Sequence, residues 1–184
     1  MPNPITHLIW GYFIARGFSK DPKYLAFGML FAICLDFDYL IPGVAHHGWI
    51  HTPLFVMGLS AMIWLVSRDK LLLALSLSIM MTHLVFDTIA TQDPIMWLWP
   101  VSTEAYALWT ISDLAALVVI KVYLILIPVM WIWETWKRTG ESPMAVFEWL
   151  DARIPRPVLY GAAASAGALL VFVWYTDYMW MLTA

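Results

Sequence analysis

The chain has 184 residues, of which 62% are hydrophobic and only 12% are charged. This composition lies outside the usual range of soluble domains and indicates an integral membrane protein. The formal net charge of -3 offers no basic surface for a nucleic acid, so we set that class of partner aside.

Apolar segments recur along the whole chain, and a membrane-spanning helix needs roughly 20 of these residues. A first segment, 5–15, is short and predicts a tilted, re-entrant or shallow helix. Five further segments approach or reach the required length: 24–41, 53–66, 71–90, 111–133 and 158–181. The predicted fold is therefore all-α, a polytopic membrane helical bundle of about six membrane helices within a single domain over residues 1–184.

The basic residues predict how this bundle is oriented. Lys and Arg fall after the first segment, between the third and fourth, and between the fifth and sixth, whereas the loops 42–52 and 91–110 contain neither. Short loops rich in Lys and Arg stay in the cytoplasm. We therefore expect a plasma-membrane protein whose loops 42–52 and 91–110 face the extracytoplasmic side, with a cytoplasmic amphipathic segment near 143–155.

All five histidines lie near that outer side, together with three carboxylates. His7 opens the first segment, and His83 and Asp87 lie towards the outer end of the fourth. The remaining residues fall between positions 36 and 52: Asp36, Asp38, His46, His47 and His51. We therefore expect the metal-site half of the domain to be residues 1–110, with 111–184 as supporting helices.

His83 and Asp87 are four residues apart on a predicted helix, so both side chains can reach one metal ion. A histidine hydrogen-bonded to a carboxylate is a common structural arrangement as well. The predicted membrane location favours ligation, because ionisable groups there are costly to bury and usually functional.

The spacing of the other residues leaves two choices open. Asp36 and Asp38 would point to nearly opposite sides of a regular helix. Both can face one site if the helix ends or unwinds there, as Pro42 and Gly43 favour; otherwise one is a ligand and the other orients a neighbour. Because Thr52 and Pro53 read as a helix start, His51 lies outside the next helix, and spacing does not decide whether His46 or His47 is its partner.

Several of these motifs together resemble the YdjM-like family of membrane-bound, metal-dependent hydrolases. The motifs occur in the same order: Thr6-His7, Asp36-Phe37-Asp38, His46-His47-Gly48-Trp49-Ile50-His51-Thr52, His83-Leu84-Val85-Phe86-Asp87 and Trp97-Leu98-Trp99-Pro100. The family is distantly similar to zinc-dependent phospholipase C and the P1-type nucleases. The resemblance covers about the first half of the chain.

The resemblance implies seven metal ligands: His7, Asp36, Asp38, His46, His51, His83 and Asp87. His46 and His51 fall on the family's histidine positions, whereas His47 stands where the family commonly has arginine. We predict His47 as a substrate contact, with a supporting role or an additional ligand as the alternatives. Seven donors exceed one tetrahedral ion and suit two divalent ions, zinc first and manganese or iron second.

The predicted function is hydrolysis of a phosphoester by a metal-activated water, with Asp38 or Asp87 as a catalytic base. Because the site is expected at the outer leaflet, the predicted substrate is a membrane lipid or a lipid-linked phosphate. The alternatives are a transporter or channel that binds ions or protons at the cluster, and a metal-stabilised membrane scaffold. Against transport, the polar groups gather towards one face and the chain has no internal repeat.

Overall fold

The computed structural model describes residues 4–41, 44, 47–90, 94–107, 114–162, 164, 165 and 168. Over these residues the structure is helical and has no strand, apart from one antiparallel bridge between Ile95 and Tyr106. The predicted all-α class is thus confirmed. The helices are α1 (Pro4–Phe18), α2 (Pro22–Ile33), the 3₁₀ helix η1 (Leu35–Leu40), α3 (Pro53–Ser67), α4 (Lys70–Ala90), α5 (Leu114–Thr139) and α6 (Ala145–Asp151).

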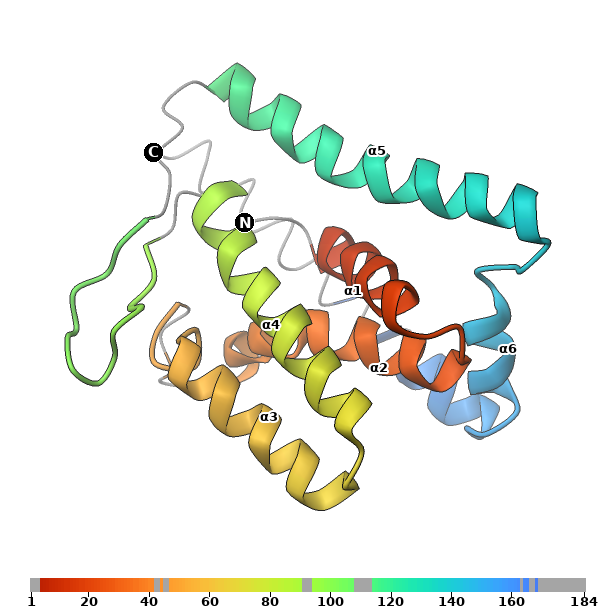
Figure 1. Ribbon diagram of the computed structural model, residues 1–184, viewed down its shortest axis with the longest axis horizontal. Helices are drawn as coiled ribbons and strands as arrows, with labels where there is room; N and C mark the ends of the chain where they lie inside the picture. Colours follow the sequence, from red (N-terminus) through yellow and green to blue (C-terminus); the bar gives the residue numbers. More distant parts are fainter. Residues whose placement is uncertain are drawn as a thin grey trace. The chain divides into compact units, whose positions relative to one another are not determined.

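The chain divides into two compact units, residues 1–140 and 141–184. The first unit contains α1 to α5, with α4 as its central helix in contact with α1, α2, α3 and α5 (Figure 1). The second unit contains α6, within the segment 143–155, and a further helical stretch over residues 156–162.

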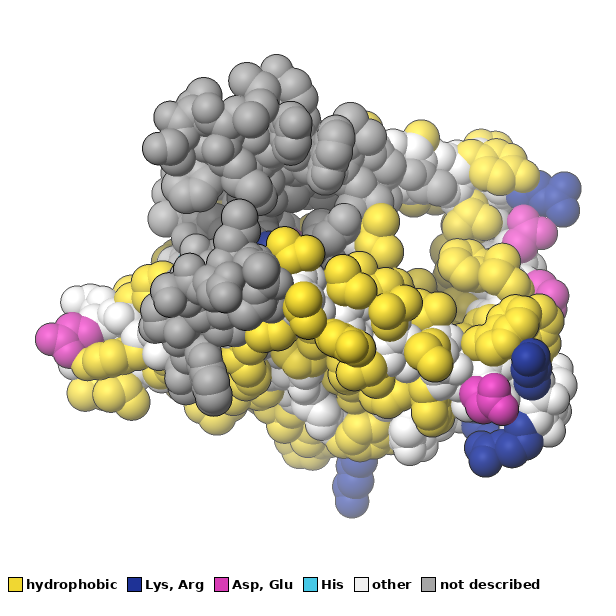
Figure 2. Space-filling view, turned by 90° about the horizontal axis from the view of Figure 1, so that it is seen from above, with side chains coloured by type: hydrophobic (Ala, Val, Ile, Leu, Met, Phe, Trp, Pro, Cys, Tyr) yellow, Lys and Arg dark blue, Asp and Glu magenta, His cyan; other side chains and the backbone are white. Residues whose placement is uncertain are grey.

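Two of the described helices are long and apolar enough to cross a membrane. These stretches are Lys70–Ile89 in α4 and Val118–Thr139 in α5. Half of the α4 stretch is buried in the structure, compared with only 6% of the α5 stretch. The apolar side chains of α5 are therefore largely exposed. Figure 2 shows one face of the molecule, on which the described side chains are mostly hydrophobic and charged ones lie at the edges.

The predicted segments 24–41 and 53–66 form apolar α-helices that are too short to count as candidate spans. α2 has 12 residues and α3 has 15, and the segment predicted as 24–41 changes from α-helix to 3₁₀ helix after Ile33. The last predicted segment, 158–181, lies mostly outside the described residues. Within the described residues two helices are candidate spans, so the predicted bundle of about six membrane helices is not confirmed.

Matching caps start α2 and α3. The Asp21 carboxylate accepts a hydrogen bond from Lys23 N at 2.8 Å, and the Thr52 hydroxyl accepts one from Phe55 N at 3.2 Å. A proline follows each cap, as helix starts favour. The predicted cap at Thr52 is confirmed, and it leaves His51 in the loop before α3.

The helices α2 and α4 are also joined at the end that carries the basic residues. Asp69, just before α4, accepts a hydrogen bond from the Tyr24 hydroxyl at 2.8 Å and lies 3.4 Å from Lys23 Nζ. The Tyr24 hydrogen bond lowers the pKa of Asp69 and keeps it ionised. The opposite ends of the same helices lead to the carboxylates and histidines.

α1 and α2 approach so closely that only glycine fits at two facing positions. A Cβ at Gly28 would lie 2.4 Å from Ala15 Cβ, and a Cβ at Gly11 would lie 2.5 Å from the Gly28 carbonyl oxygen. Small residues allow such backbone contact between apolar helices. The contact fixes α1, and with it His7, against α2.

We expect Gly28→Ala to lower the free energy of unfolding by about 1–3 kcal/mol, because the added methyl forces the two helices apart. Gly58→Ala is the matched control: nothing lies within 4 Å of its Cβ position in the middle of α3. That change should stabilise the protein by about 0.5–1 kcal/mol through helix propensity. Denaturation of the purified protein in detergent measures both, and equal effects would contradict the packing argument.

α5 contains Pro128, which cannot donate the hydrogen bond that the Leu124 carbonyl would receive in a regular helix. The indole Nε1 of Trp10 supplies it instead, at 2.7 Å. The Trp10 ring also packs edge-on against Phe86 of α4 at 4.9 Å. A side chain of α1 therefore joins α5 to the central helix.

Trp10→Phe should destabilise the protein by about 1–3 kcal/mol, because it leaves the Leu124 carbonyl without a donor. In a Pro128→Ala background the helix provides its own N–H, so the same substitution should cost about 1 kcal/mol less. A double-mutant cycle in thermal or chemical denaturation measures the difference. If the effects of Trp10→Phe and Pro128→Ala were strictly additive, the Trp10 hydrogen bond would not be a replacement for the N–H that Pro128 lacks.

Candidate metal centre

Four separate parts of the chain bring the histidines and carboxylates together. α1 supplies His7, η1 supplies Asp36 and Asp38, the loop before α3 supplies His47 and His51, and α4 supplies His83 and Asp87. Five of these residues are buried: His7, Asp38, His51, His83 and Asp87. Asp36 and His47 are the more accessible members, with 13% and 9% of their side chains exposed. The predicted ligand His46 lies outside the described residues.

Asp87 is at the centre of the cluster. Its Oδ2 lies 3.0 Å from His83 Nε2, 3.6 Å from His47 Nε2 and 3.7 Å from His51 Nε2. Its Oδ1 lies 3.6 Å from His7 Nε2. Imidazoles thus lie near both oxygens of one carboxylate, as a carboxylate that holds two ions would require.

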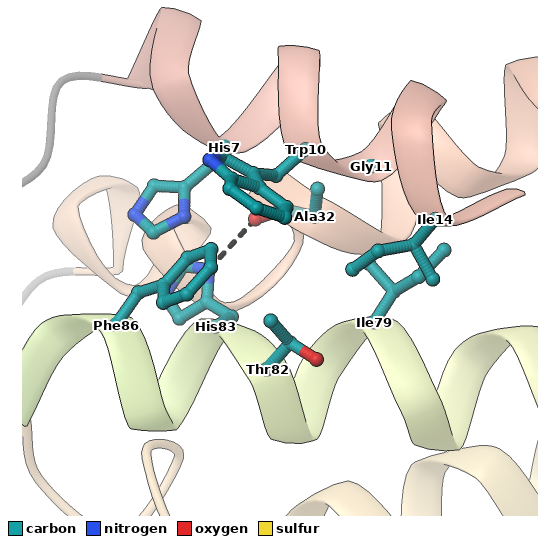
Figure 3. Close-up of a pocket in the computed structure, with 9 residues that line it drawn as sticks. All are labelled: His7, Trp10, Gly11, Ile14, Ala32, Ile79, Thr82, His83 and Phe86. Carbon is teal, nitrogen blue, oxygen red and sulfur yellow. Dashed lines mark hydrogen bonds between the residues drawn. The ribbon is translucent and has the colours of Figure 1, made fainter. Parts of the chain in front are cut away.

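Two histidines each have an oxygen atom close to the ring nitrogen Nδ1. His83 Nδ1 lies 2.7 Å from the Ala32 carbonyl oxygen, the contact drawn as a dashed line in Figure 3. His51 Nδ1 lies 3.1 Å from Asp38 Oδ2. A proton on Nδ1 leaves the Nε2 lone pair directed at Asp87, and metal-binding histidines are oriented in this way.

The two aspartates of η1 contact different histidines. Asp36 Oδ1 lies 3.5 Å from His83 Nε2, whereas Asp38 faces His51. A 3₁₀ helix advances about 120° per residue, so residues two apart diverge less than on an α-helix. The change from α2 to η1 therefore lets both carboxylates reach one cluster, and the geometry favours Asp36 as a ligand and Asp38 as the residue that orients His51.

The ring of His7 stacks on that of His83, with centroids 4.0 Å apart and planes 15° apart. Beside this pair, α1, α2 and α4 line a small cavity with residues that include Trp10, Phe86 and Thr82 (Figure 3). Its volume of about 10 Å³ is close to what one water molecule needs. The interior side of the cluster is therefore closely packed.

The donor atoms fall into three overlapping triplets, in each of which all three lie within 4.8 Å of one another. The triplets are His7, His83 and Asp87; Asp36, His51 and His83; and His47, His51 and Asp87. Within the described part of the chain, the buried atoms His83 Nε2 and Asp36 Oδ2 have no hydrogen-bond partner. Buried polar atoms are normally satisfied, so these atoms fit a site that could hold a metal ion.

Burial also sets the protonation of His51, which lies in a loop. The loss of hydration lowers the pKa of His51, although the adjacent Asp38 carboxylate opposes the shift. The neutral imidazole is the form that binds metal.

Six of the seven predicted ligands converge in the structure, and His47 joins them. Sequence spacing did not reveal the support that Ala32 gives to His83, because any residue could offer a backbone carbonyl. Nor did it show that Asp38 faces His51, since that contact depends on the 3₁₀ turn.

Comparisons with known proteins give no match: no family model, no curated protein and no solved structure corresponds to the chain. The resemblance to the YdjM-like family therefore stays a prediction, and the function is inferred from the cluster itself.

We expect Asp38→Asn to weaken binding of Zn²⁺ or Co²⁺ by roughly 10–100-fold, the usual effect of losing a residue that orients a ligand. Asp36→Asn, which changes a direct donor, should weaken it further. Titration of the purified protein with Co²⁺ measures both. A larger loss for Asp38→Asn than for Asp36→Asn would reverse the two roles.

Proposed function

We propose that the protein is a membrane-embedded, metal-dependent hydrolase that cleaves a phosphoester, and that it belongs to the YdjM-like family. The observation that carries the proposal is the arrangement around Asp87. Two histidines have their Nδ1 atoms held by acceptors, and their Nε2 atoms converge on this buried carboxylate. This is a ligand geometry prepared for a cation.

The membrane arrangement in this proposal is a bundle of about six helices with the basic loops in the cytoplasm. Two long apolar helices and the exposed apolar side chains of α5, such as Tyr123, Ile127 and Met130, support it. The contact of Lys23 and Tyr24 with Asp69 supports it too, because it gathers the basic ends of α2 and α4 away from the cluster. The cluster then belongs to the extracytoplasmic side of the plasma membrane.

The donor set suits two divalent ions, with zinc favoured and manganese or iron as alternatives. Three carboxylates, Asp36, Asp38 and Asp87, meet in this cluster, and carboxylates in an apolar interior require a compensating charge. When bound, such ions lower the pKa of a water molecule and stabilise negative charge on phosphate oxygens.

The residues of the chain then have distinct roles. Asp87 would help to hold both ions, since it belongs to the triplet with His7 and His83 and to the triplet with His47 and His51. Asp38 is buried behind His51 and orients that ring rather than meeting the substrate. Asp36, whose Oδ1 lies 3.5 Å from His83 Nε2, would hold a metal ion together with His83 and His51.

Exposed aromatic side chains beside the site favour a lipid or lipid-linked substrate. Phe37 lies between the two aspartates and is 38% exposed, and Trp49 lies between His47 and His51 and is 45% exposed. Trp49 packs edge-on against Phe55 at 5.4 Å and lies 6.5 Å from Trp99. Exposed aromatic side chains next to the site residues suit acyl or prenyl chains better than a soluble phosphoester.

The test is hydrolysis of phospholipids and generic phosphoesters by the purified protein after loading with Zn²⁺ or Mn²⁺. His83→Ala should abolish both stoichiometric metal binding and turnover. Ser76→Ala is the matched control on α4, because Ser76 precedes His83 by about two helical turns and its hydroxyl donates to the Leu73 carbonyl of its own helix. It should retain bound metal and turnover.

Purified wild-type protein that binds no transition metal would refute the proposal. Metal binding without hydrolysis of any phosphoester would instead favour the alternatives, a cation or proton transporter or a metal-stabilised scaffold. Ion flux into vesicles distinguishes those two.

A further inference from the structure

His47 lies in the cluster rather than at its rim. Its Nε2 is 3.6 Å from Asp87 Oδ2, and its ring centroid is 4.9 Å from that of His51. Only 9% of the side chain is exposed. A side chain that reached out to substrate would leave more of its ring accessible.

The backbone at His47 is in the left-handed region, with φ of 59°. Non-glycine residues rarely adopt this conformation, and where they do it is often at functional sites. The loop closes immediately afterwards through a hydrogen bond from His51 N to the Gly48 carbonyl at 3.0 Å. This turn places two imidazoles against the same carboxylate oxygen.

We propose that His47 is a metal ligand, which holds a second ion together with His51 and Asp87. The inference rests on the proposed metal-dependent function. The donor atoms of these three residues lie within 4.8 Å of one another, as do those of His7, His83 and Asp87 in the neighbouring triplet. Asp87 belongs to both triplets, so it would contribute to holding both ions.

This role differs from that of an arginine, the residue that the YdjM-like pattern commonly has here. A guanidinium stays protonated and donates hydrogen bonds only, so it can bind a phosphate but not a metal. With an imidazole at position 47, the positive charge that meets an anionic substrate comes from the second ion instead.

The experiment counts ions. Purified full-length wild type, His47→Asn and His47→Arg are loaded with Zn²⁺, dialysed and analysed for metal per chain. Asparagine tolerates the left-handed backbone, so it removes the imidazole without disturbing the turn. We expect two ions in wild type and one in both variants, whereas Val44→Ala, a control in the same loop, should keep two.

Chemical rescue separates ligation from folding. His47→Gly permits the same backbone and leaves space for a free imidazole molecule. Imidazole in the buffer should restore the second ion to this variant and leave the content of His47→Arg unchanged.

If His47→Asn and His47→Arg keep the wild-type metal content and affinity, the inference is overturned and His47 is a substrate contact or a packing residue. A wild-type protein with a single ion that His47→Asn retains overturns it as well. Wild type without metal is a distinct result, because it refutes the proposed hydrolase itself.

Discussion

The burial of the Asp87 carboxylate is the constraint on which the rest of the first unit depends. A carboxylate in an apolar helical interior is costly unless partners compensate its charge. Asp87 has four imidazoles within 3.7 Å of its oxygens. These imidazoles come from α1, from the loop before α3 and from α4 itself, so the surroundings of the carboxylate are complete only when all of these elements are in place.

The packing of α1 also serves to position an imidazole near Asp87. His7 can stack on His83 at 4.0 Å because Gly11 and Gly28 allow α1 to lie directly against α2. Trp10 lies one turn further along α1 and packs on Phe86. It donates a hydrogen bond to the Leu124 carbonyl of α5, which Pro128 cannot do because it has no N–H. The same helix therefore positions a ligand and joins the exposed α5 to the buried α4. Disturbance of the glycine contact should reach the site through this route.

Much of the site followed from sequence because its signals are local or compositional. The four-residue spacing of His83 and Asp87 places both on one face of α4, and the Thr52–Pro53 start leaves His51 in the loop. The absence of Lys and Arg from the loops near the cluster indicated that its members belong to one side. What escaped prediction depends on backbone detail: the change to 3₁₀ helix that separates the roles of Asp36 and Asp38, and the left-handed turn that brings in His47. The hydrogen bond from Trp10 to Leu124 joins residues 114 positions apart, and no local sequence pattern can predict such a contact.

The short helices also bear on how deep a substrate must reach. At about 1.5 Å per residue, the 12 residues of α2 and the 15 of α3 extend roughly 18 and 22 Å, less than the roughly 30 Å of a bilayer core. His83 and Asp87 follow Lys70 by 13 and 17 residues, or roughly 20 to 25 Å along α4. If the basic ends stand at the cytoplasmic surface, the cluster lies several ångströms below the opposite edge of the apolar layer. A soluble phosphoester would have to leave water to reach that depth, whereas the headgroup of a lipid is already anchored near it. In the proposed orientation, the depth of the site and the exposed aromatic side chains next to it would favour the same class of substrate.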